Sequence, residues 1–310
     1  MFRLTLILIV TLFCNLSFAS TGIIPGLGSE SPLMPEDGLK VQGECKMMFL
    51  SSGLMLNYCT ASFPNEAIPR NIVYFFHGMN GQPGNIFTLL SPNSPFYPMA
   101  KQLYKEAPFY ISLSLGARET VPVEAAGLDP ASLRDLLDTA IPTIERDFLF
   151  YGIPVSRHLI GMSLGGHNAL SVAALRPKYF KSVMAICPAL ISFNPFDATQ
   201  VQDYIARQPY VINPTLVNDM VAALKTKFVN EANWSARNPL NLLAEGRYDG
   251  VNLFISTGNR DEYGFLEGAE AFATTASRRN MRSMVYAPTT GGHCSADMLG
   301  LGQFLSIQLR

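Results

Sequence analysis

Short β-rich runs alternate with helical patterns along most of the chain, and this alternation restricts the possible folds more than any other feature. The runs are rich in branched and aromatic residues and cover 71–76, 109–115, 158–162, 182–187, 251–257 and 283–287. Apolar residues at helical spacing lie between them, most clearly in the segment 133–148. Strands that alternate with helices favour a mostly parallel sheet covered by helices on both faces. We therefore predict an α/β protein.

Residues 1–19 have the composition of an export signal. An arginine precedes an apolar run over 4–13, and small residues follow it up to Ala19. A charged start, a short apolar run and a small-residue end are typical of a cleavable signal peptide. The run is too short to span a bilayer comfortably. We therefore predict a secreted or periplasmic protein without stable membrane insertion, in which a Pro-, Gly- and Ser-rich arm over 20–38 leads into one domain over 39–310.

Composition argues against several classes of function. Hydrophobic residues make up 48% of the chain and charged residues 15%, which is typical of a compact globule and not of a disordered chain. The formal net charge is -1, so nothing points to a nucleic acid as partner. The histidines are scattered and the HExxH pattern is missing, so we expect neither a metal nor another cofactor.

The cysteines fit an exported protein, in which disulfides are permitted. Cys45 and Cys59 stand at facing ends of a predicted hairpin over 46–61, which suits a bridge between them. Cys187 and Cys294 would then form a second bridge. Four cysteines allow three connectivities, and buried free cysteines that act as small hydrophobes are the alternative.

The most informative motif is Gly161-Met162-Ser163-Leu164-Gly165, which stands between a predicted strand and a predicted helix. This is the context of a nucleophile elbow, in which a serine occupies a tight turn and glycines two residues away avoid a collision. The turn presents the hydroxyl at a helix N-terminus, where the helix dipole favours negative charge. The motif alone is weak, and a glycine-rich turn with an incidental serine is the other interpretation.

A serine hydroxyl needs a base to take its proton and an acid to orient that base. His293 follows the last predicted strand, which is the place of the base when the chain order is serine, acid, histidine. The remaining histidines suit this order less well; they are His77, His158 and His167. Asp261 follows the strand at 251–257 and is the first choice for the acid, with Glu262 as the alternative. Because Asp is a favoured N-cap, Asp261 could also cap the helix that follows.

Acyl transfer further requires hydrogen-bond donors for the developing oxyanion. The backbone N–H of Leu164, directly after the serine, is one candidate. The second should come from the loop after the first central strand, which reads HGMNGQPG over 77–84. We choose the N–H of Met79. A phosphate-binding loop is disfavoured because the Lys-Ser/Thr ending is missing.

Taken in order, these segments resemble a known group of enzymes. The order HGMNG, AIPTIERDF, SRHLIGMSLGGHNAL, GNRDE and GGH is similar to the putative-esterase branch of the α/β-hydrolase superfamily, which includes esterase D, feruloyl esterases and mycolyltransferases. The resemblance covers about residues 70–300. It implies an α/β-hydrolase fold, a triad of Ser163, Asp261 and His293, and oxyanion donors at Met79 and Leu164.

The chain departs from the family in one respect. Some secreted tannase-like and feruloyl esterases bridge a cysteine before the nucleophile to a cysteine after the base. Here Cys294 follows His293, but Met162 precedes Ser163. That clamp is absent in its usual form, and Cys187 is the remaining partner.

Residues 191–246 interrupt the alternation with several helical patterns before the strand that carries the acid. We interpret them as a helical insertion, either a lid or a segment that covers the edge of the sheet. The combined features predict a secreted serine esterase that acts on a small-molecule or polymer-linked ester through an acyl-enzyme. An acyltransferase with the same triad, or a non-catalytic binding protein of this fold, is the alternative. The sequence leaves the oligomeric state open.

Overall fold

The computed structural model describes residues 41–310 apart from 52, 54, 64–68, 80, 95, 98–107, 116–133, 149–154, 209–213 and 229. The predicted signal peptide, the arm over 20–38 and the start of the helix that leads to 148 lie outside the described residues. A search of the described part of the chain found no helix both long and apolar enough to cross a membrane.

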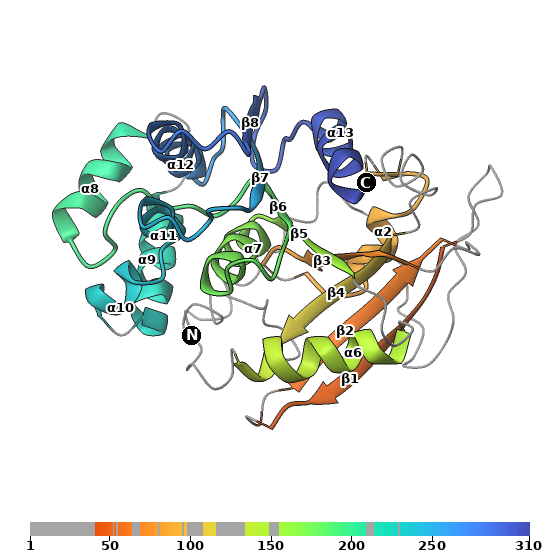
Figure 1. Cartoon of the computed structure of the whole chain (residues 1–310). Helices are drawn as coiled ribbons and strands as arrows, with labels where there is room; N and C mark the ends of the chain where they lie inside the picture. Colours follow the sequence, from red (N-terminus) through yellow and green to blue (C-terminus); the bar gives the residue numbers. More distant parts are fainter. Residues whose placement is uncertain are drawn as a thin grey trace.

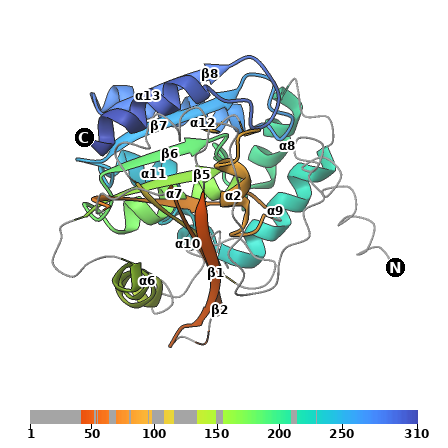
Figure 2. The same ribbon diagram turned by 90° about the vertical axis from the view of Figure 1, so that its right-hand side faces the viewer.

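One eight-stranded sheet forms the centre of the molecule, in the order β1-β2-β4-β3-β5-β6-β7-β8 (Figure 1). The strands are β1 (Gln42–Phe49), β2 (Met55–Ser62), β3 (Asn71–Phe76), β4 (Phe109–Leu115), β5 (Ser156–Met162), β6 (Ser182–Ile186), β7 (Asn252–Gly258) and β8 (Met284–Thr289). β2 pairs antiparallel with β1 and β4, whereas every neighbouring pair from β4 to β8 is parallel. The sheet twists from β1 at one end to β8 at the other (Figure 2). The predicted mostly parallel α/β fold is confirmed.

Helices cover both faces of this sheet. The described helices are α2 (Asn85–Leu89), the π-helical η2 (Asp135–Ala140), α6 (Ile141–Phe148), α7 (Leu164–Leu175), α8 (Ala198–Arg207), α9 (Pro214–Phe228), α10 (Glu231–Ser235), α11 (Pro239–Ala244), α12 (Phe265–Arg278) and α13 (Met298–Leu309). One buried apolar cluster joins the sheet to η2, α6, α7, α11 and α12. A second cluster joins the opposite face to α2 and α13.

The strand β3 shows why its sequence is apolar throughout. Ile72, Tyr74 and Phe76 belong to the first cluster, whereas Val73 and Phe75 belong to the second. Successive side chains of a strand point to opposite faces, and both faces of this sheet are covered. Burial on both sides therefore removes the usual alternation of apolar and polar residues.

The proline in the helix over 133–148 has a structural counterpart. A proline inside a helical pattern, here Pro142, predicts a kink, and the π-helical segment η2 ends two residues before it. Proline has no N–H to donate, and its ring collides with the carbonyl four residues earlier in an α-helix. A wider turn at this point relieves both conflicts, so the helix continues into α6.

A buried polar network holds α6 against the sheet. Glu145 accepts a hydrogen bond from the Tyr74 hydroxyl at 2.5 Å and two from the Arg157 guanidinium at 2.7 Å each. The bidentate pair satisfies both carboxylate oxygens of Glu145, which is buried. This network gives a structural reason for the glutamate in the segment AIPTIERDF.

The segment between β6 and β7 carries α8, α9, α10 and α11, on the side of the molecule away from β1 and β2 (Figure 1). Its helices α8, α9 and α10 enclose a third apolar cluster with large aromatic members, Phe193, Tyr204, Phe228 and Trp234 among them. The segment therefore has a small core of its own, and its helix α11 packs against α7 and α12.

Candidate active site

Ser163 lies in the sharp turn between β5 and α7. Its φ of 54° and ψ of -119° lie in a region that residues other than glycine rarely adopt. Hydrogen bonds hold this backbone on both sides. The Ser163 N–H donates to the Ile186 carbonyl at 2.8 Å, and the Ala189 N–H donates to the Ser163 carbonyl at 3.0 Å. The turn thus fixes Ser163 at the N-terminal end of α7, where the helix dipole favours negative charge.

The glycines of the motif are required by close backbone contacts. A Cβ on Gly161 would lie 2.1 Å from the Gly165 carbonyl oxygen, and a Cβ on Gly165 would lie 2.0 Å from the Phe76 carbonyl oxygen. No real Cβ tolerates such distances, and in each case the obstacle is backbone that cannot rotate away. The glycines therefore let α7 approach β5 and β3 closely enough to form the elbow.

His293 and Asp261 complete a chain of hydrogen bonds that starts at Ser163. The His293 Nε2 lies 2.9 Å from the Ser163 Oγ, and the His293 Nδ1 lies 2.7 Å from the Asp261 Oδ2. Asp261 is buried and follows β7, whereas His293 follows β8. A carboxylate only accepts, so a neutral His293 carries its proton on Nδ1 and accepts from the serine hydroxyl through Nε2. The structure brings the three predicted residues together.

The two consecutive carboxylates after β7 contact different atoms of His293. Asp261 accepts a hydrogen bond from the His293 ring, whereas Glu262 Oε2 accepts one from the backbone N–H of His293 at 2.8 Å. The second oxygen of Asp261 accepts from the Tyr263 N–H at 2.9 Å. The N-cap of α12 is Gly264, so Asp261 is not the cap of that helix. The contact of Glu262 with the main chain of His293 was not predicted.

Two aromatic rings flank the histidine. The ring centroids of Tyr263 and Phe265 lie 4.6 Å and 5.6 Å from that of His293, and the two aromatic rings stack on each other at 5.8 Å. These distances are those of favourable aromatic contacts. The rings restrict the imidazole from the side, and their position directly after the acid is the one signal in the sequence that could have indicated them.

The loop after β3 lies next to the serine. A Cβ on Gly78 would lie 3.4 Å from the Ser163 Cβ. The Gly78 carbonyl is 2.9 Å from the Nδ1 of His77 and accepts from the Gly81 N–H at 3.0 Å. Because a carbonyl and the following N–H point in opposite directions across a trans peptide, these contacts also set the direction of the Met79 N–H. Leu164 begins α7, and the first N–H groups of a helix have no acceptor within it.

The remaining three histidines are buried and lie in other contacts. The ring nitrogens of His158 lie 2.7 Å from the Ser182 hydroxyl and 3.2 Å from the Asn71 side-chain oxygen. The Nδ1 of His167 lies 3.0 Å from the Ala189 carbonyl. Burial lowers the pKa of His77, and it lowers the pKa of His158 and of His167 to about 4. These histidines are therefore neutral near pH 7.

We expect the free energy of unfolding to decrease as the pH falls from about 6.5 towards 4. Unfolded histidine takes up a proton near pH 6.5, whereas His158 and His167 do so only near pH 4 in the folded state, so the unfolded chain binds more protons between these values. The pKa difference corresponds to about 3 kcal/mol lost per histidine. Urea unfolding at pH 7, 6 and 5 measures this slope, and His158→Leu should flatten it. A free energy of unfolding that is equal at pH 7 and pH 5 would contradict the prediction.

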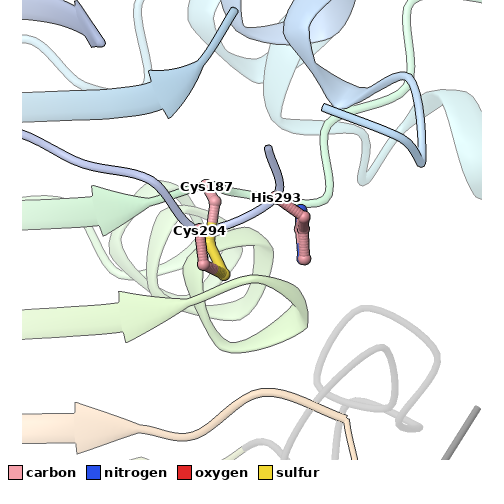
Figure 3. Close-up of side chains that lie close together, drawn as sticks. All are labelled: Cys187, His293 and Cys294. Atoms are coloured by element: carbon pink, nitrogen blue, oxygen red, sulfur yellow. A yellow bond between two sulfur atoms is a disulfide. The ribbon is translucent and has the colours of Figure 1, made fainter. Parts of the chain in front are cut away.

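Two disulfides join the four cysteines in the described part of the chain. Cys45 and Cys59 face each other across β1 and β2 and are bonded, as are Cys187 and Cys294. Figure 3 shows the Cys187–Cys294 bridge beside His293. Its sulfur atoms lie within 4.8 Å of a ring nitrogen of His293. Since each sulfur is bonded to the other, this group offers no thiolate to a metal.

Comparisons with known proteins identify the family and the fold of this chain. The family model described as putative esterase matches residues 64–297. A search of curated proteins gave no match. Similar solved structures include a ferulic acid esterase, with 14% identity over 87% of this chain and 96% of that chain and a TM-score of 0.56. An S-formylglutathione hydrolase from Staphylococcus aureus has 12% identity over 87% of this chain and 99% of that chain, with a TM-score of 0.55. An S-formylglutathione hydrolase from Agrobacterium tumefaciens has 14% identity over 92% of this chain and 99% of that chain, with a TM-score of 0.55.

At these identities the similarity is one of fold, whereas the family model covers most of the chain. The chain belongs to the putative esterase family, and its sheet, helices and strand-end elbow are those of the α/β-hydrolase fold.

Proposed function

We propose that this protein is a secreted serine esterase that hydrolyses a carboxylic ester through an acyl-enzyme on Ser163. The observation that carries the proposal is the hydrogen-bonded chain from the Ser163 Oγ through His293 to Asp261, with distances of 2.9 Å and 2.7 Å. This is the arrangement that activates a serine hydroxyl near neutral pH.

In the acylation step the Ser163 Oγ attacks the ester carbonyl carbon while His293 Nε2 takes the hydroxyl proton. The tetrahedral intermediate collapses when His293 returns this proton to the alcohol oxygen, which leaves with its bonding pair. Asp261 stays ionised and holds the imidazolium through Nδ1. Water then attacks the acyl-enzyme in the same way and releases the acid, so Ser163 is regenerated.

The oxyanion of each intermediate would accept hydrogen bonds from the backbone N–H groups of Leu164 and Met79. The start of α7 supports the first donor, since its N–H has no partner within the helix. The hydrogen bonds to the Gly78 carbonyl support the second, since they hold the Gly78–Met79 peptide beside Ser163. Preorganised donors of this kind contribute several kcal/mol to transition-state stabilisation.

The segment over 191–246 would cover the side of the site formed by the acid turn. Two contacts support this placement. The Tyr204 hydroxyl donates to the Gly264 carbonyl at 2.6 Å, and Arg207 forms an ion pair with Glu267 on α12 at 2.6 Å. Both join α8 to residues that lie three and six positions after Asp261. We propose that this segment contributes to substrate selection.

Export is supported by the signal-like residues 1–19 and by the disulfides, because cytosolic proteins rarely retain such bonds. The substrate would therefore be an ester outside the cytosol, either a free small molecule or an ester attached to a polymer.

A fluorophosphonate probe tests the proposal directly, because only an activated serine displaces its leaving group. We expect stoichiometric labelling at Ser163, located by mass spectrometry of the digested protein, together with turnover of short-chain aryl esters. Labelling should disappear after heat denaturation. A folded, exported protein that neither reacts with the probe nor hydrolyses any ester in a chain-length series would point to a non-catalytic binding protein.

A further inference from the structure

His293 is held at two independent points by neighbouring carboxylates. Asp261 Oδ2 lies 2.7 Å from the ring Nδ1, and Glu262 Oε2 accepts from the backbone N–H at 2.8 Å. The first contact acts on the protons of the imidazole. The second is remote from the reacting atoms and acts only on where the main chain of His293 lies.

The turn that carries His293 is rich in glycine, so its main chain depends on hydrogen bonds for a fixed position. Gly291 and Gly292 precede the histidine, and Gly291 has a φ of 148°. Glycine leaves the unfolded and locally opened chain with the greatest conformational freedom. A Cβ on Gly292 would lie 2.8 Å from the Glu262 Oε2, so the glycine leaves room for the carboxylate.

Other contacts hold neighbouring parts of the turn, and the next residue, Cys294, is bonded to Cys187. The Gly291 carbonyl accepts from the Arg260 N–H at 2.9 Å, and the Asp297 N–H donates to the Ser256 hydroxyl at 2.8 Å. The Gly292 carbonyl of the same peptide group accepts from the Ser295 N–H at 3.1 Å, and among the described contacts the hydrogen bond to Glu262 is the one made by the His293 N–H.

We propose that Glu262 is a positioning residue for His293, distinct from the acid of the triad. Glu262 sets the main-chain position from which the imidazole reaches Ser163, and Asp261 sets the tautomer of the ring. A base displaced by about 1 Å can lose two orders of magnitude in rate, so the effect should appear in the chemical step. This proposal rests on the proposed ester hydrolysis.

A positioning role and an acid role for Glu262 predict different effects of replacing its carboxylate by an amide. Glu262→Gln keeps an oxygen that accepts from the His293 N–H, so kcat should stay within roughly threefold of the unmodified enzyme. Glu262→Ala removes the acceptor, and kcat should fall about 10- to 100-fold with KM nearly unchanged. Glu245→Ala, which removes an exposed carboxylate near the opposite edge of the sheet, is the matched control and should change neither constant.

Hydrogen–deuterium exchange of the full chain provides a readout that needs no activity. The amide of His293 should exchange faster in Glu262→Ala and at the normal rate in Glu262→Gln, measured on the peptide over 290–297. Unchanged exchange and a kcat within threefold in Glu262→Ala would overturn the proposal. A second result would also overturn it: Glu262→Gln loses as much kcat as Glu262→Ala, while Asp261→Asn stays active. Glu262 would then be the acid of the triad.

A different result would show that the proposed ester hydrolysis on Ser163 is wrong. In that case Ser163→Ala would retain full turnover in the same assay, whereas the exchange comparison would still decide whether Glu262 holds the His293 peptide.

Discussion

Replacement of Ser163 by alanine is expected to lower kcat for short-chain aryl esters by about 10⁴- to 10⁶-fold. The substitution removes the only atom that can form the acyl-enzyme and leaves the N–H of Leu164 and the loop around Met79 in place. Some acceleration over the uncatalysed reaction should therefore remain, since oxyanion donors and binding act without the nucleophile.

The alanine enzyme should fold as well as the unmodified one. Both residues must adopt the φ of 54° at position 163, so the strain is similar in the two proteins. Steady-state kinetics and a thermal melt of the same preparation measure the two quantities. A kcat within tenfold of the original value in a fully folded protein would rule out Ser163 as the nucleophile.

Asp261→Asn should be the second most damaging change, with kcat reduced by about 10⁴-fold. Asparagine has almost the same shape, and its carbonyl oxygen can still accept from the Tyr263 N–H. Its NH₂ group, however, would donate to His293 Nδ1, and the imidazole would then carry its proton on Nε2. Such a ring cannot take a proton from Ser163.

Kinetics at several pH values and a thermal melt check this expectation. KM should change little, because Asp261 is buried behind the histidine and does not face the substrate. Little loss of kcat in Asp261→Asn would show that another group orients His293.

The positions of the three triad residues could be predicted because they depend on chain order and sheet direction alone. Parallel strands end at the same edge of a sheet, so residues after β5, β7 and β8 must meet there. Ser163, Asp261 and His293 could each be placed by this rule. The hydrogen bond from the His293 N–H to Glu262 could not, because it depends on the path of one side chain through a glycine turn.

Parts of the fold were also beyond prediction. The order of β4 and β3 in the sheet depends on long-range pairing, which the alternation of strands and helices leaves open. Pro142 predicts a kink, but the sequence does not say how a helix accommodates a proline, so the π-helical turn before it could not be predicted. The contact of Tyr263 and Phe265 with His293 could not be predicted, because it depends on where the turn after β8 places the histidine.

The Cys187–Cys294 bridge restricts the conformations of the unfolded chain. It closes a loop with a sequence separation of 107, which contains Asp261 and every helix from α8 to α12. In the chain-entropy account, closing a loop of this length lowers the entropy of the unfolded state, which raises its free energy by about 5 kcal/mol at room temperature. The base and the strand next to the nucleophile thus stay covalently tethered even when the intervening helices open, so a partly opened molecule needs only a short search to reassemble its triad.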